Sequence, residues 1–76
     1  MWEEGNLIIK GEIVNFSAKV YEVGSEFGID GGKISKLMIK VNGRMTVHYD
    51  RGWDIELNEN DKISKEAYEQ IIKKYN

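Results

Sequence analysis

The chain has 76 residues, no cysteine, a single histidine and a formal net charge of −2 at pH 7. A domain of this size buries only about 60% of the surface that its unfolded chain exposes, so its core is thin. Disulfides and multi-histidine metal sites are excluded, and neither a metal nor a cofactor is predicted. The small net charge argues against a nucleic-acid binder, which needs a basic surface, and against a nucleic-acid mimic, which needs an acidic one.

The sequence also lacks an apolar signal segment and any run of about 18 apolar residues that would cross a membrane. Together with the absence of cysteine, this predicts a cytoplasmic protein without a membrane partner. There are no repeats, low-complexity tracts or linker-like shifts in composition. Residues 1–76 are therefore interpreted as a single domain.

Strand patterns dominate the first two thirds of the chain, where apolar and polar residues alternate with a period of two. A glycine-rich loop at residues 22–32 interrupts them. Four strands are predicted, at residues 7–9, 13–21, 34–41 and 44–50.

The Asn-Gly pair after the third predicted strand sets the register of the last hairpin. A two-residue turn would pair Leu37 with His48 and so place an apolar face against a polar one. A three-residue loop over residues 41–43, with the glycine left-handed, instead pairs Leu37 with Val47, and this loop is the predicted one. The opposite face of the hairpin would then carry a basic strip in which Lys36 lies beside His48.

Residues 64–75 have the pattern of a helix, with Ser64 as the N-cap and Ile63 placed to staple against Tyr68. Apolar residues recur three and four positions apart along this segment, at Ala67, Ile71, Ile72 and Tyr75. The predicted fold is α+β: a four-stranded antiparallel meander with the single C-terminal helix packed on one face. The second sheet face and the edge strands stay uncovered, which predicts a homodimer.

The segment at residues 24–33 has four glycines among its first nine residues. Glycine conformations allow backbone amides to converge, and converging amides bind anions. A Walker A loop is excluded because the lysine of this segment is followed by Ile34 and a strand, and a dinucleotide fingerprint is excluded because no crossover helix follows. The segment is therefore either an anion site formed by Gly28, Gly31 and Gly32 or a connection that turns tightly.

A second segment, residues 49–54, places Tyr49, Arg51 and Trp53 between carboxylates. These residue types are the ones most enriched at interface hot spots, although a tryptophan here would equally cap the core. An antiparallel hairpin places the start of the third strand beside the end of the fourth, so Lys33 and Arg51 should emerge at the same end of the sheet. A binding surface is predicted there.

The only histidine, His48, allows one enzymatic interpretation. His48, Arg51 and Glu56 have the residue types for the acid, phosphate clamp and base of a small ribonuclease-like enzyme. Such a thin domain offers little volume for a closed pocket, so a protein without catalytic activity is predicted instead.

Residues 16–21, 24–29, 31–37 and 49–54 carry a resemblance that extends from the second strand to the end of the chain. Through these segments the chain is similar to short uncharacterised proteins encoded by phages and prophages of Gram-positive bacteria. Those relatives tend to have a proline after the last of these segments, where this chain has Glu56-Leu57. The family has no assigned activity, so the resemblance implies a phage setting in a host cytoplasm and no mechanism.

Three hypotheses for function follow. The leading one is a non-enzymatic binding protein that engages a host factor, such as a component of the defence machinery, through Arg51, Trp53 and the glycine loop. The second is a sponge that sequesters a phosphorylated small molecule or nucleotide, and the third is the ribonuclease-like enzyme. The predicted binding residues are Gly28, Gly31, Gly32, Lys33, Lys36, Tyr49, Arg51 and Trp53.

Overall fold

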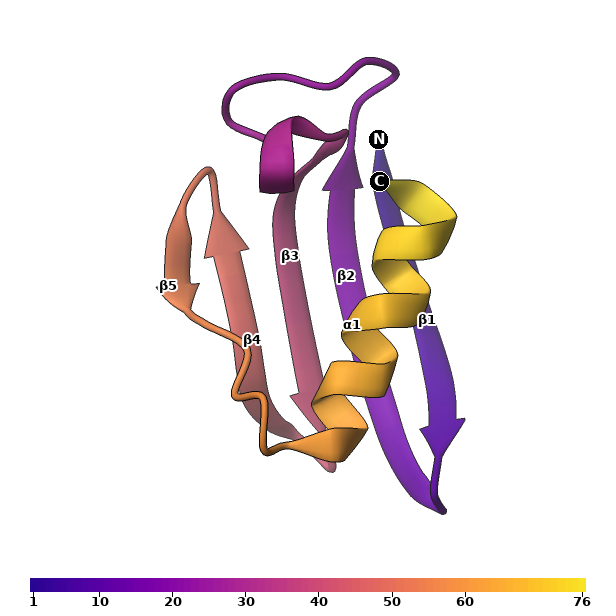
Figure 1. Ribbon diagram of the computed structural model, residues 1–76. Helices are drawn as coiled ribbons and strands as arrows, with labels where there is room; N and C mark the ends of the chain where they lie inside the picture. The colour runs from indigo at the N-terminus through magenta and orange to yellow at the C-terminus, as the bar shows by residue number, and fades with distance from the viewer.

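A computed structural model describes all 76 residues as one five-stranded antiparallel sheet with a C-terminal α-helix lying across one face (Figure 1). Its elements in chain order are β1 (Trp2–Ile9), β2 (Glu12–Val20), the 3-10 turn η1 (Ile29–Gly31), β3 (Ile34–Val41), β4 (Arg44–Asp50), β5 (Trp53–Ile55) and α1 (Lys62–Tyr75). The strands are neighbours in sequence order, which makes the sheet a meander. The α+β class, the antiparallel sheet and the C-terminal helix are therefore confirmed.

The number of strands is five rather than the predicted four, because a short strand follows the Asp-Arg-Gly turn. Arg51 adopts a φ of 55°, and the chain reverses so that Trp53 pairs with Tyr49. The first strand also begins earlier than predicted, at Trp2, because residues 2–9 pair with β2 without interruption. Its polar residues and Gly5 conceal this strand in the sequence.

The hairpin between β3 and β4 corrects the predicted register. Asn42 and Gly43 have φ values of 50° and 85°, so the turn has two residues, as its left-handed dihedrals require. The extra residue lies in β4, where a bulge shifts the register so that Ile39 pairs with Val47. The predicted three-residue loop is therefore wrong, and so is the predicted pairing of Leu37 with Val47. Leu37 pairs with Tyr49 instead, so apolar residues still face each other.

The corrected register also changes the predicted basic strip. Lys36 pairs with Asp50 rather than lying beside His48, and the Lys36 Nζ is 3.8 Å from a carboxylate oxygen of Asp50. His48 instead pairs with Met38 on the face turned away from the helix. The positive charge of this face is therefore partly balanced.

The core lies between α1 and the sheet, with α1 packed on β1, β2 and β3. Alternate residues of the strands point into it, and the glycine loop adds Ile29. Its buried members are Ile9, Val14, Ala18, Ile29, Ile34, Leu37, Ile39, Val47, Tyr49, Ala67 and Ile71. No element covers the other face of the sheet (Figure 1).

The helix begins two residues earlier than predicted, and its N-cap is Asp61 rather than Ser64. One carboxylate oxygen of Asp61 accepts from the backbone NH of Ser64 at 3.1 Å, and the other accepts from the Ser64 hydroxyl at 2.7 Å. These hydrogen bonds hold the pKa of Asp61 below its ordinary value of 3.8. The Ser64 hydroxyl also lies 2.6 Å from the hydroxyl of Thr46, so the cap is joined to the bulge of β4.

Replacing Ile71 with Ala should lower the free energy of unfolding by about 2–5 kcal/mol, because this side chain is 2% exposed between helix and sheet. Denaturant unfolding followed by circular dichroism measures the change. Glu69→Ala, on the exposed side of the same helix, is the matched control. Equal midpoints for the two variants would show that α1 does not dock as described.

Replacing Asp61 with Ala should lower the free energy of unfolding by about 0.5–2 kcal/mol at pH 7, because the helix loses its cap. A carboxyl group with a depressed pKa stabilises the fold above its ordinary pKa of 3.8, and this contribution disappears as the pH falls through the folded-state value. The difference between wild type and variant should therefore shrink below pH 3.8. Asp61→Asn keeps an acceptor and should lose less stability at pH 7; a difference independent of pH would argue against this cap.

Candidate functional site

The glycine-rich connection between β2 and β3 folds as a compact loop held by its own backbone. Gly28 NH donates to the Ser25 carbonyl at 3.0 Å, and Ser25 NH donates to the Gly32 carbonyl at 3.2 Å. A Cβ atom on Gly28 would lie 1.9 Å from the Gly32 carbonyl oxygen. Glycine is therefore required there by close backbone contact.

The backbone NH groups of the three predicted site glycines are all engaged inside this loop. Gly31 NH donates to Gly28 at 3.1 Å, Gly32 NH donates to Ile29 at 2.8 Å, and Gly28 NH donates to Ser25. An anion bound at this end of the molecule would therefore have to be held by side chains rather than by these amides.

Asn76 joins the loop to the end of the helix. Its side-chain amide donates to the Ile29 carbonyl at 3.0 Å, and its side-chain oxygen accepts from the Ile34 NH at 2.9 Å. A Cβ atom on Gly32 would collide with this side chain at 2.3 Å. Sequence reasoning missed Asn76, because a single asparagine after a helix gives no signal of a partner more than 40 residues away.

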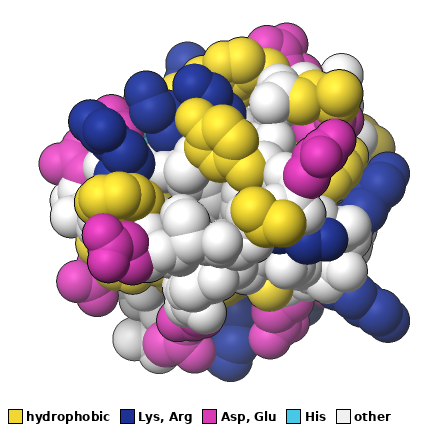
Figure 2. Space-filling model, turned by 90° about the horizontal axis from the view of Figure 1, so that it is seen from above, with side chains coloured by type: hydrophobic (Ala, Val, Ile, Leu, Met, Phe, Trp, Pro, Cys, Tyr) yellow, Lys and Arg dark blue, Asp and Glu magenta, His cyan; other side chains and the backbone are white.

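Beside the loop, the end of the sheet has a hollow of about 510 Å³, which we call the loop-end hollow. It is lined by three cationic, three apolar and two hydroxyl-bearing side chains: Lys19, Tyr21, Val23, Ser25, Phe27, Ser35, Lys36 and Arg51. Figure 2 views this end of the molecule, where apolar side chains lie beside lysine and arginine side chains. Tyr21, Val23 and Phe27 are 48%, 74% and 51% exposed.

Strand pairing and two hydrogen bonds assemble the hollow from distant segments. Lys19 of β2 lies opposite Lys36 of β3. The backbone NH of Arg51 donates to the Ser35 carbonyl at 2.9 Å, which fixes the turn after β4 beside the start of β3. The Tyr49 hydroxyl donates to the Phe27 carbonyl at 2.8 Å and fixes the loop above them.

Positive charge exceeds negative charge in the loop-end hollow, although the whole chain is slightly acidic. The Nζ of Lys36 and the Nε of Arg51 each lie 3.8 Å from the same carboxylate oxygen, on Asp50. Lys19 has its ammonium group 5.5 Å from the centre of the Tyr21 ring. Lys36 and Arg51 therefore share one carboxylate, Lys19 forms no ion pair, and all three cations line the hollow.

The comparison with protein families matches residues 1–76 to a domain of unknown function, DUF7678. The chain belongs to this family. No curated protein and no solved structure matches it.

The structure of the DUF7678 domain does not place Trp53 in the hollow with Arg51. Trp53 lies on the helix side of β5, with its ring edge-on to Tyr49 at 4.9 Å and 6.1 Å from Tyr68. Trp53 is 42% exposed. Burial raises the pKa of Tyr68 above its ordinary value of 10.0, and the carboxylate of Asp30 adds to the shift. Trp53 thus covers an end of the core, one of the two roles left open by the sequence.

Lys33 is exposed at the same end of the sheet as Arg51 but does not line the hollow. Its backbone carbonyl accepts from the NH of Tyr21 at 2.9 Å, which closes the base of the loop. Lys19, Tyr21 and Phe27 line the hollow, although sequence reasoning did not include them among its binding residues. The signal for Lys19 was the alternation of β2, which places it on the same face as Lys36, whereas Tyr21 and Phe27 lie in the connection after β2, outside that pattern.

No cavity contains the three residues of the ribonuclease-like hypothesis together. The Nδ1 of His48 lies 2.8 Å from a carboxylate oxygen of Asp54, and no cavity is lined by both His48 and Arg51. Glu56 lines none of the cavities. No group of three or more metal-ligating side chains is present, and no helix is both long and apolar enough to span a membrane.

Replacing Asn76 with Ala should destabilise the loop locally, because two hydrogen bonds to Ile29 and Ile34 are lost. Each bond of this kind contributes about 1 kcal/mol. Amide hydrogen exchange measured by nuclear magnetic resonance should show faster exchange at Ile34 with little change in β1 and β2. The matched control is Asn60→Ala, in the exposed connection before α1; unchanged exchange at Ile34 would contradict the proposed anchoring.

Proposed function

We propose that this chain is a non-enzymatic binding protein and that the loop-end hollow is its working surface. The observation that carries the proposal is the convergence of three cations and three exposed apolar side chains on one concavity. Exposed apolar groups gathered in one place are characteristic of interaction sites rather than of solvated surface. Arginine and tyrosine, both present here, are residues that contribute strongly to interface affinity.

The chemistry of the hollow selects an anionic partner that also carries an apolar group. Lys36 and Arg51 are both partly exposed while they share Asp50, so neither is sequestered in a buried ion pair. A guanidinium group binds a carboxylate through two parallel hydrogen bonds, which adds geometry to the charge attraction. An acidic protein segment with a neighbouring apolar side chain would contact both the cationic and the apolar residues of the hollow.

The resemblance to phage and prophage proteins suggests where such a partner would be found. In that setting the partner would be a host protein, such as a component of the defence machinery, and the binding protein would act in the host cytoplasm. This step rests on analogy, whereas the charge and shape of the partner rest on the hollow itself.

A phosphorylated small molecule is the second candidate ligand, and the size of the hollow favours it. A hollow of about 510 Å³ falls in the range of small-molecule sites, about 300–1,000 Å³. Lys19, Lys36 and Arg51 would hold the phosphate, and the ring of Tyr21 or Phe27 would stack on a base. The engaged amides of the glycine loop weigh against this candidate, because they remove the backbone donors that phosphate sites commonly use.

The double variant Lys36→Glu/Arg51→Glu should lose the protein partner, because it replaces two attracting charges with two repelling ones. Tagged wild-type and variant proteins are incubated with a lysate of a Gram-positive bacterium, and captured proteins are identified by mass spectrometry. The expected result is a protein that is captured by wild type and lost with the double variant. Its affinity for the wild type should fall as salt is raised.

Lys40→Glu is the matched control, because Lys40 lies on the same strand and the same sheet face as Lys36 but outside the hollow. It should retain the captured protein. Mass spectrometry of small molecules released from the purified wild type tests the second candidate in parallel. Identical captures by wild type and double variant, with no released phosphorylated compound, would reject the loop-end hollow as the working surface.

A further inference from the structure

One edge of the sheet is long and carries two glutamates but no lysine, proline or bulge. β1 is eight residues long and lies at the end of the strand order, whereas β5 at the other end has only three residues. Edge strands are commonly protected by lysine, proline or a bulge. β1 has no lysine or proline and pairs with β2 without a bulge. Its free side is therefore a template for another strand.

The pairing with β2 determines which backbone groups of β1 are free. Met1 and Val20 exchange two hydrogen bonds, from Val20 NH to the Met1 carbonyl at 2.8 Å and from the Met1 amino group to the Val20 carbonyl at 3.0 Å. Antiparallel pairs alternate between bonded and non-bonded positions. The odd-numbered residues of β1 therefore bond to β2. The NH and C=O groups of its even-numbered residues point outward, at Trp2, Glu4, Asn6 and Ile8.

We propose that β1 pairs antiparallel with β1 of a second copy of this chain, about a two-fold axis through Gly5. An axis normal to the sheet keeps both helices on the same side and places even-numbered residues opposite even-numbered residues. The register centred on Gly5 then pairs Trp2 with Ile8 of the partner subunit and Glu4 with Asn6 of the partner subunit. The two sheets become one continuous sheet.

The side chains of β1 are complementary to themselves in this register. Trp2 and Ile8 are 53% and 70% exposed on the open sheet face, and each covers the other across the axis. An aromatic residue opposite a β-branched residue is a favourable cross-strand pair. Neither glutamate lies opposite a carboxylate, because Glu4 meets an asparagine. The neighbouring register, centred on Asn6, would instead place Glu4 opposite Ile8 of the partner subunit.

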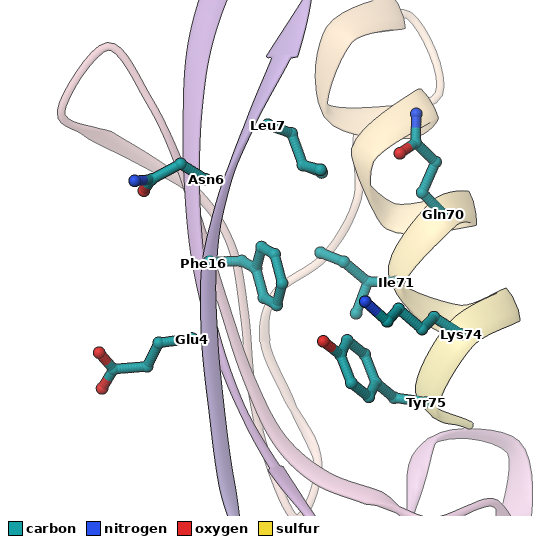
Figure 3. Close-up of a pocket in the computed structure, with 9 residues that line it drawn as sticks. Glu4, Asn6, Leu7, Phe16, Gln70, Ile71, Lys74 and Tyr75 are labelled. Carbon is teal, nitrogen blue, oxygen red and sulfur yellow. The ribbon is translucent and has the colours of Figure 1, made fainter.

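The helix side of the same edge also fits a second copy. A groove of about 270 Å³ lies between β1 and α1, where Leu7, Phe16, Ile71 and Tyr75 surround it while Asn6 and Glu4 point away (Figure 3). Gln70 and Lys74 of the helix also line it. In the Gly5 register, Glu3 of the partner subunit lies opposite Leu7 on this side of the sheet. Leu7 lies at the Gln70 end of the groove (Figure 3), so this carboxylate would meet the side-chain amide of Gln70, which is a hydrogen-bond donor.

Sedimentation velocity and engineered disulfides test this interface together. At high micromolar concentration the wild type should sediment at twice its monomer mass of 8.8 kDa, and Ile8→Lys should sediment as a monomer with an unchanged circular dichroism spectrum. The chain has no cysteine, so Trp2→Cys/Ile8→Cys introduces the only two thiols. Six positions along one extended strand separate these residues by about 20 Å, which prevents a bond within one chain. Oxidation should therefore give a covalent dimer.

The pair Glu4→Cys/Ile8→Cys is the control, because it would be in bonding range only in the register centred on Asn6. It should give no covalent dimer. A monomeric wild type, a dimer that survives Ile8→Lys, or cross-linking by the control pair alone would overturn the proposal. The loop-end hollow contains no residue of β1, so failure of this interface leaves the proposed binding function standing and can be told apart from its failure.

Discussion

Tyr49 joins the three parts of the molecule on which the candidate site depends. Its ring is buried in the core and packs against Trp53 in a T-shaped arrangement, and its hydroxyl holds the glycine loop through the carbonyl of Phe27. It reaches this position because the bulge in β4 brings it opposite Leu37. Without that extra residue in the strand, the side chains of β4 beyond the bulge would exchange faces, and the hydroxyl would point away from the loop.

The periodic parts of the sequence predicted the fold class, because two strong patterns agree with each other. The alternation along residues 13–21 and 34–41 and the helical stripe through Ala67 and Ile71 each mark one buried face. The patterns missed most of β1 and all of β5, which backbone hydrogen bonds hold in the sheet. β1 contains a glycine and several polar residues, and β5 consists of three residues after a left-handed arginine, so neither has a long apolar alternation.

The candidate site was only partly predictable, for a similar reason. Strand geometry predicts that the start of β3 lies near the end of β4, and Arg51 and Ser35 are indeed joined there by a backbone hydrogen bond. The direction of each side chain depends on single-residue shifts that composition does not reveal. The turn at Arg51 places Trp53 on the helix side of the sheet. Lys19 of β2 lines the hollow because it pairs with Lys36 of β3. The three cations are therefore brought together by pairing, not by nearness in sequence.

The first and last residues of the described chain lie close together at one end of the molecule (Figure 1). Met1 is bonded to Val20 at the end of β2, and Asn76 is bonded to the loop that begins one residue later. Two of the connections at the opposite end are tight two-residue turns, and both residues of the first, Lys10-Gly11, are exposed (Figure 1). This geometry suits circular permutation: a short linker across the two ends, with a new opening at the first hairpin, would keep every strand neighbour while changing the order in which they are synthesised. It would also move the chain ends to the side opposite the glycine loop, so that a label could be attached far from that loop.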